Sequence, residues 1–428
     1  MAATPQPFRF RRAADFTALR LGRAILGYLA LMTGIITLAP FEFQSTPAHG
    51  LTTVWNWSDL IMNVVMFVPF GFAYQLTRPR GAPPDWPRVV VLGAALSGAI
   101  ELAQLFSPQR YTSLLDLGTN TLGAAVGAGL FARLARHLPD DTTVRSLALE
   151  LPLMGLVYQL VPLTWLVGLG AEDTVRRWLV LIIATMAGAI VGTVHAAYVA
   201  PQHPRGARGT QRWLWGTLIG WAVVALPPAL RDDAPVISAA LVLLTGSAVL
   251  RSIATIRRSR QEPSGRFELP TLRLVMPLFA AYLTLSALWP IANLSPDWQG
   301  TWLLVLPVVE LSQPLVFRAL EQVAAFTLVG YLSAEYHGRD WRTLSLVWPR
   351  LLAWSLPVAL LLQAARGWRA DSGASVSLLV LTQVAAMFGG WLYVLQRAHV
   401  QALVARRALL SALPARDTTT ESLDQPGS

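Results

Sequence analysis

Cysteine and lysine are both absent from this 428-residue sequence. Without cysteine the chain can form no disulfide, no thiol nucleophile and no cysteine-ligated metal site. The six histidines are scattered, so the sequence predicts neither a metal site nor a cofactor. Charged residues make up only 14% of the chain, whereas a soluble domain carries about a quarter. The composition is therefore not that of an ordinary soluble protein.

Apolar residues make up 54% of the chain, and they gather in segments of about 17 to 22 residues along its whole length. Only helices and closed barrels satisfy every backbone polar group in lipid, and the strand alternation of a barrel is absent. The sequence predicts an all-α, polytopic membrane protein whose main partner is the lipid bilayer. The net charge of +10 comes from arginines between the apolar segments, so no nucleic-acid partner is predicted.

Hydropathy predicts about twelve transmembrane helices. They fall near residues 24–40, 59–77, 89–106, 114–134, 147–167, 178–199, 213–230, 236–250, 272–291, 319–335, 351–365 and 376–396. No cleavage pattern follows the first apolar segment, which we expect to be retained.

The arginines orient these helices. The segment before the first helix carries Arg9, Arg11, Arg12, Arg20 and Arg23, whereas residues 41–57 carry none. Arginine-rich and arginine-poor loops then alternate, and the loop with Arg366 and Arg369 is the main exception. By the positive-inside rule we expect both termini to be cytoplasmic.

Polar side chains gather at one depth of the predicted bundle. The outer ends of the second, third and fourth helices, with the loop between the last two, carry Asp59, Asn63, Glu101, Gln104, Arg110, Asp116 and Asn120. The spacing of Asp59 and Asn63, and of Asp116 and Asn120, puts each pair on one helix face. A carboxylate in a membrane is costly without a partner, and Arg110 is the candidate partner of Glu101 or Asp116.

Two interpretations of these side chains stay open. In the structural one they join helices and cap helix starts, where Asp59 and Asp116 are favoured by exposed N–H groups and the helix dipole. In the functional one they form an outward-facing pocket that binds a lipid-linked or cell-wall headgroup. Glu101 favours the second interpretation, because it lies within an apolar pattern where no capping role explains it.

The same residues form an ordered motif. An Asn is followed by Phe-x-Pro-x-Gly, a Glu precedes a Gln, an Arg follows, and Asp-x-x-x-Asn-x-x-Gly ends the series. These positions are Asn63, Phe67, Pro69, Gly71, Glu101, Gln104, Arg110, Asp116, Asn120 and Gly123. In order and spacing, about the first third of the sequence resembles the VanZ-like membrane family. The resemblance implies a four-helix domain in a bacterial inner membrane, associated in the family's namesake with reduced susceptibility to the lipoglycopeptide teicoplanin.

Small residues and an internal repeat complete the predicted organisation. Gly118, Gly123 and Gly127 should let the fourth helix approach its neighbours closely. The last four helices resemble the first four, as a degenerate second VanZ-like unit. The alignment pairs Phe67 with Phe326, Gly71 with Gly330, Asp59 with Arg318, Glu101 with Gln363, Asp116 with Leu379 and Asn120 with Gln383. The charged set is thus lost from the second unit, and the two units are parallel copies.

The predicted domains follow from these patterns. They are a basic cytoplasmic segment 1–23, a VanZ-like unit 24–137, a middle transmembrane segment 138–255, a basic linker 256–271, the second unit 272–400 and a tail 401–428 with a disordered end. The middle segment carries no motif that assigns it a role.

Three functions fit the sequence. The first, which the motif and the gathered polar groups favour, is a cell-envelope protein that binds a lipid-linked glycan, cell-wall or polysaccharide intermediate. The second is a membrane enzyme with Glu101 or Asp116 as general acid or base, although no nucleophile motif accompanies them. The third is a secondary transporter, although the acids are predicted at one face and not at the midplane. The sequence leaves open whether the protein is an enzyme.

Overall fold

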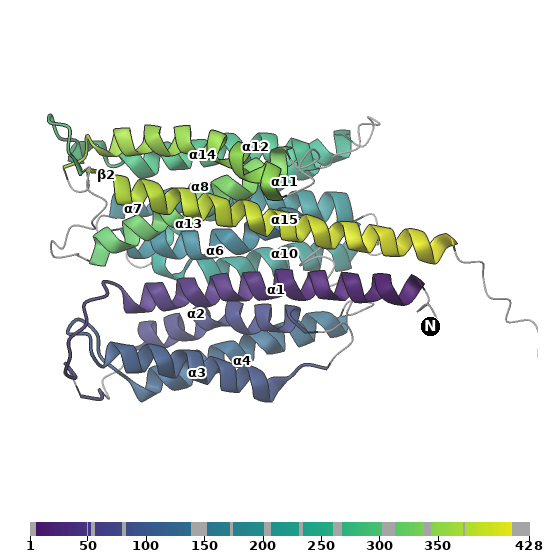
Figure 1. Ribbon diagram of the computed structural model, residues 1–428, viewed down its shortest axis with the longest axis horizontal. Coiled ribbons are helices and arrows are strands. Elements are labelled where there is room, and N and C mark those ends of the chain that lie inside the picture. Colours follow the sequence, from purple (N-terminus) through teal and green to yellow (C-terminus); the bar gives the residue numbers. More distant parts are fainter. Residues whose placement is uncertain are drawn as a thin grey trace, which may run out of the picture.

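The computed structural model describes residues 6–48, 50–52, 56–78, 83–137, 152–171, 174–200, 207–230, 234–259, 268–301, 313–337, 344–370 and 373–412. Figure 1 shows long helices that lie side by side along one direction, with α1 to α4 on one side of the bundle and α12 and α14 on the other. The N-terminal end of α1 and the C-terminal end of α15 lie at the same end of the bundle (Figure 1).

The helices follow the predicted apolar segments. The first unit contains α1 (Gln6–Leu38), α2 (Trp57–Leu76), α3 (Trp86–Gln104) and α4 (Leu114–His137). The middle segment contains α6 (Pro152–Leu169), α7 (Thr174–Arg177), α8 (Leu179–Val194), which continues as a π-helix η2 (His195–Val199), α10 (Ala207–Ala225), the 3-10 turn η3 (Pro227–Ala229) and α11 (Ala234–Ser259). The last part contains α12 (Glu268–Leu288), the 3-10 turn η4 (Ile291–Asn293), β1 (Gly300–Thr301), α13 (Gln313–His337), α14 (Leu344–Arg366), β2 (Ala374–Ser375) and α15 (Val376–Ala412).

The all-α, polytopic prediction is confirmed, because every predicted apolar segment falls on a helix. Within the described residues, nine helices are long and apolar enough to cross a membrane, and α4, α6 and α10 fall short of that standard. The strands β1 and β2 form a parallel pair of two residues each. The apolar helix α8 is buried along its whole length, as a helix that is hydrophobic on every side must be.

The helices extend beyond the predicted segment boundaries. Helix α1 has 33 residues, and a bilayer core needs only about 20, so the basic segment predicted at 1–23 continues the first helix. Helices α11 and α12 take up much of the predicted linker 256–271. Helix α15 runs on to Ala412 into the predicted tail, and the predicted disordered end at 413–428 lies outside the described residues.

Close glycine contacts join α2 to α4. A Cβ added to Gly71 would lie 1.8 Å from the carbonyl oxygen of Ala124, and one added to Gly127 would lie 2.0 Å from that of Val68. Gly123 faces the backbone of α2 in the same way. These contacts confirm the close approach predicted for Gly123 and Gly127. The prediction was wrong for Gly118, whose added Cβ would meet nothing within 4 Å, because it lies on the open side of α4.

Helices α13 and α15 also pack through glycines that lie against backbone carbonyl groups of the other helix. A Cβ added to Gly330 would lie 1.8 Å from the carbonyl oxygen of Ala386, and one added to Gly389 would lie 1.8 Å from that of Thr327. Helix α15 also packs on α1, where the ring of Phe388 stacks on Tyr28 and His399 hydrogen-bonds Thr17. The first and last parts of the chain therefore contact each other directly.

Candidate functional site

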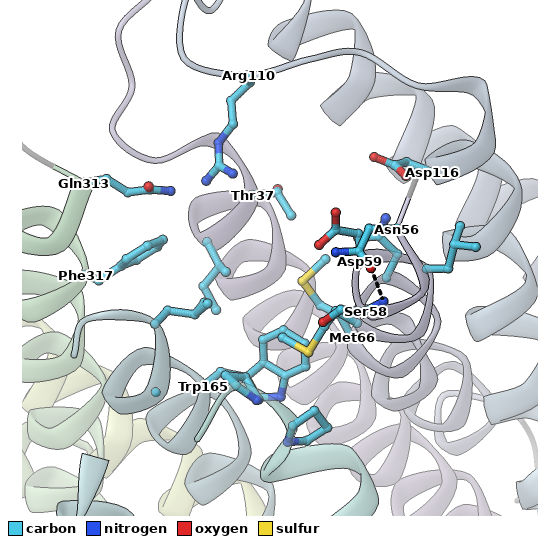
Figure 2. Close-up of a pocket in the computed structure, with 18 of the residues that line it drawn as sticks. Thr37, Asn56, Ser58, Asp59, Met66, Arg110, Asp116, Trp165, Gln313 and Phe317 are labelled. Atoms are coloured by element: carbon cyan, nitrogen blue, oxygen red, sulfur yellow. Dashed lines mark hydrogen bonds between the residues drawn. The ribbon is translucent and has the colours of Figure 1, made fainter. Parts of the chain in front are cut away.

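A cavity of about 870 Å³ opens at one end of the bundle, where α1, α3, α6 and α10 end and where α2, α4 and α13 begin. Its polar lining is Thr37, Thr52, Asn56, Ser58, Asp59, Asn63, Gln104, Gln109, Arg110, Tyr111, Ser113, Asp116, Arg177 and Gln313. Its apolar lining includes Ile36, Leu60, Met62, Met66, Trp165, Leu169, Pro227, Pro228 and Phe317. Figure 2 shows charged and amide groups around its upper part, with Met66 and Trp165 below them. The cavity has both a polar part and an apolar part.

The structure brings five of the seven predicted site residues to this cavity: Asp59, Asn63, Gln104, Arg110 and Asp116. The other two are buried outside its lining. Asn120 donates from its side chain to the hydroxyl of Ser97 at 2.9 Å, which joins α4 to α3. Glu101 accepts a hydrogen bond from the backbone N–H of Ser113 at 2.8 Å, which holds the start of α4 against α3. These two residues have a structural contact that the predicted site did not include.

The N-termini of α2 and α4 present the two cavity carboxylates. Asn56 caps α2, since its side-chain oxygen accepts from the N–H of Ser58 at 3.1 Å, and Asp59 lies in the first turn. Asp116 lies in the first turn of α4, and Asn63 of α2 lines the cavity with it. The partial positive charge of a helix N-terminus stabilises a carboxylate at both places. The sequence thus places these acids for a local reason.

Arg110 does not form the predicted ion pair with Glu101 or Asp116. Its Nε and Nη2 atoms donate to the carbonyl oxygen of Ala39, at 3.2 and 3.0 Å. Gln104 donates to the carbonyl oxygen of Thr37 at 3.0 Å in the same region. The last carbonyl groups of a helix have no partner within it, so the end of α1 attracts these donors. Desolvation lowers the pKa of the Arg110 guanidinium, because burial disfavours its charged form.

One wall of the cavity was not predicted from the sequence. Trp165 comes from α6, Arg177 from α7, and Gln313 and Phe317 from the start of α13. Figure 2 shows Gln313 and Phe317 on one side of the cavity and Asp59 on the other. The sequence does contain one indication of this wall. Arg176 and Arg177 follow the apolar segment predicted at 147–167 and so lie on the outer side, where the other predicted loops carry few arginines.

A buried ion pair fixes the position of α7. Arg176 donates from Nη2 to a carboxylate oxygen of Glu321 in α13 at 2.9 Å. The other oxygen of Glu321 accepts from the hydroxyl of Tyr282 in α12 at 2.7 Å. Arg176 also donates to the carbonyl oxygens of Ser286 and Trp289. We call Arg176, Glu321 and Tyr282 the α7 anchor, since they hold the segment that carries Arg177.

Comparisons with known proteins address the first part of the chain. A family model described as VanZ/LLP1 matches residues 12–136. The protein named Protein VanZ from Enterococcus faecium is 26% identical over 133 residues, which is 30% of this chain and 80% of that protein. Residues 12–136 form a VanZ-like domain. No solved structure matches the chain.

The VanZ-like domain supplies the carboxylates and Arg110, and the rest of the chain supplies the opposite wall. Among the described residues, no ion pair joins Asp59 or Asp116 to Arg110 or Arg177. Both signs of charge therefore occur in the described lining of the cavity. An arrangement of this kind can bind a charged, partly apolar molecule.

Proposed function

We propose that this VanZ-like membrane protein binds the headgroup of a lipid-linked glycan or cell-wall precursor in the cavity. The observation that carries the proposal is a chamber of about 870 Å³ with charged groups beside an apolar floor, at the end of a helix bundle. Ligand sites of this size and mixed lining are common, and a membrane interface brings lipid headgroups to this depth. From the family resemblance we propose that such binding reduces susceptibility to teicoplanin-type glycopeptides.

The arginines support a cavity that faces outward from the bacterial inner membrane, with both termini cytoplasmic. At the cavity end the described arginines are buried or half-buried; they are Arg110, Arg176, Arg177, Arg318, Arg366 and Arg369. Near the opposite end, exposed arginines include Arg20, Arg23, Arg88, Arg133, Arg212, Arg251, Arg257, Arg258, Arg273 and Arg350. Exposed arginines mark the cytoplasmic side by the positive-inside rule.

We also propose that residues 272–400 are a degenerate second VanZ-like unit. The Gly71–Ala124 contact has its counterpart in Gly330–Ala386, at the same distance. Arg110 bonds the carbonyl oxygen that precedes Pro40, and Arg369 bonds the one that precedes Pro290. The glycine contacts match Ala124 of α4 with Ala386 of α15, which shifts the sequence alignment of these two helices by one residue. With this shift Thr382 corresponds to Asn120, and Leu378 corresponds to Asp116.

Loop contacts repeat in the same order. After α3, the carbonyl groups of Leu105 and Phe106 accept from the N–H groups of Ala48 and Gln44. After α14, the carbonyl groups of Gly367 and Trp368 accept from those of Gln299 and Ser295. Hydrogen bonds between distant segments are specified by the fold, so their repetition supports a duplication more strongly than an alignment of apolar helices does.

The bond that Glu101 makes in the first unit is made by the amide of Gln363 in the second, which helps to distinguish a structural role of Glu101 from a functional one. Glu101 accepts from the N–H of Ser113, twelve residues later, and Gln363 accepts from the N–H of Ser375, also twelve residues later. The second unit makes this bond with an amide, so the bond itself does not require a negative charge. The charge of Glu101 is then available for a role in the cavity region, next to Asp116.

Native mass spectrometry of co-purifying lipids tests the proposal. The wild type is compared with the Glu101→Gln, Asp116→Asn double variant and with Asp297→Asn, which removes an exposed carboxylate elsewhere. We expect a specific isoprenoid-linked lipid on the wild type and the control, and its loss from the double variant at an unchanged melting temperature. An unchanged lipid profile with a lowered melting temperature would show that the polar groups only join helices.

A further inference from the structure

The charges of the cavity are sorted by sign. The carboxylates of Asp59 and Asp116 come from the adjacent starts of α2 and α4. The guanidinium groups come from the loop after α3, which carries Arg110, and from α7, which carries Arg177. Figure 2 shows Arg110 reaching into the cavity from above, apart from the two carboxylates at the side. Arg110 and the two carboxylates therefore lie in different parts of the cavity lining.

Among the described residues, no ion pair reaches Asp59 or Asp116. Asp59 and Asp116 both line the cavity, and Asn63, which lies one helical turn after Asp59, is a neutral amide in the same lining. A positive group placed between the carboxylates would offset their negative charge. A primary ammonium suits the place, because its three N–H donors match two carboxylates and the amide oxygens of Asn56 or Asn63.

The basic region is prepared for an anion. Arg110 is fixed by two hydrogen bonds to Ala39 through Nε and Nη2, and no described residue bonds its Nη1 atom. A guanidinium held in this way binds phosphate or carboxylate with little loss of side-chain freedom.

We propose that the headgroup bound by this cavity is zwitterionic, with an ammonium group at Asp59 and Asp116 and a phosphate or carboxylate at Arg110. This inference rests on the proposed headgroup binding and names its ligand class. A purely anionic headgroup would bring negative charge to the carboxylates, and a neutral sugar would leave both regions uncompensated. A divalent cation is a poorer fit, since the described residues contain no group of three potential metal ligands from histidine, cysteine and acids.

The test uses defined lipids on the delipidated full-length protein, with retention measured by native mass spectrometry. The probes are phosphatidylethanolamine, which is zwitterionic with a primary ammonium, phosphatidylglycerol, which is anionic, and diacylglycerol, which is uncharged. We expect the wild type to retain phosphatidylethanolamine at least about tenfold better than phosphatidylglycerol, the scale of one charge-assisted bond. Asp59→Asn with Asp116→Asn should abolish this preference, whereas Arg110→Gln should weaken retention of both phospholipids. Asp297→Asn is the matched control.

Each result has a defined meaning. Equal retention of the two phospholipids by the wild type, or an unchanged preference in the aspartate double variant, overturns the zwitterionic assignment. Phosphatidylglycerol retention that still depends on Arg110 would leave headgroup binding itself intact. Retention of none of the three lipids overturns the zwitterionic assignment, whereas the proposed binding of a lipid-linked glycan is decided separately by the lipids that co-purify with the wild type. Asp59→Asn alone, at an exposed position, replaces the double variant if that variant does not fold, and it should lower the preference without lowering the melting temperature.

Discussion

Removal of one partner from the α7 anchor should strongly destabilise the protein. The Arg176 and Glu321 side chains are 5% and 1% exposed, and their charged atoms lie 2.9 Å apart. Loss of one partner from a buried ion pair costs about 3–5 kcal/mol, because the other charge stays buried without its counter-charge. Glu321→Met should fall at the lower end, about 3 kcal/mol, since Arg176 keeps its two carbonyl partners. Arg176→Met should cost about 4 kcal/mol, since Glu321 keeps only Tyr282.

A double-mutant cycle separates the pair from its surroundings. The Arg176→Met, Glu321→Met variant replaces two buried charges by apolar side chains, so it should lie within about 2 kcal/mol of the wild type. The free energy of unfolding is measured in mixed micelles through the fluorescence of the 16 tryptophans. Arg88→Met is the control, because its pair with Asp85 is at the surface and Arg88 is 74% exposed, where a pair contributes about 0–1 kcal/mol. A double variant as unstable as the sum of the single variants would refute the reasoning.

Three further predictions concern packing and charge. Gly71→Ala should destabilise the α2–α4 pair by about 1–3 kcal/mol, whereas Gly118→Ala should be neutral or slightly stabilising, as measured by melting temperature. Desolvation raises the pKa of Asp85, but the hydrogen bonds and charges of two neighbouring arginines outweigh it and hold the pKa below 3.8. The stability from Asp85 is therefore complete above that value and is lost as the pH falls through the lower folded-state pKa, so a scan from about pH 5 to about pH 2 should show an acid-dependent loss that Asp85→Asn lacks. Thr17→Cys with His399→Cys should be joined by a short bis-maleimide cross-linker in this cysteine-free chain, as gel mobility would report, and a failure to cross-link when both thiols are labelled by a monofunctional maleimide would contradict the α1–α15 contact.

The first unit was predictable because its determinants are local. Apolar runs of the right length gave the helices, and the spacing of Gly123 and Gly127 gave the close face of α4. Gly118 has similar spacing but faces away from the neighbouring helices, and a helical pattern alone does not say which glycines are buried. The helix ends were less predictable, because a helix such as α1 can continue through a basic segment beyond the membrane core.

The partner of Arg110 could not be found by matching charges in the sequence. A search for charge partners in the sequence considers carboxylates. The partner of Arg110 is instead a backbone carbonyl group at the end of α1, which lacks a partner within the helix and is placed there only when the helix forms. The wall with Trp165 and Phe317 was missed for a related reason. Its residues are distant in sequence from the motif, and only the packing of α6 and α13 beside α1 and α2 brings them to the cavity.

The arginines on the outer side of the predicted bundle are exceptions to the positive-inside rule, and their contacts show why the fold accepts them. An arginine on the arginine-poor side is disfavoured unless the fold binds it, and Arg176 and Arg369 are both buried against backbone carbonyl groups of the chain. Arg176 and Arg369 therefore have structural contacts that account for their positions. Arg110 and Arg177 differ, because they also line the cavity. Hydrogen bonds to the carbonyl group of Ala39 explain why Arg110 is tolerated in the fold, and its place in the cavity lining is the reason that the proposed ligand carries an anionic group.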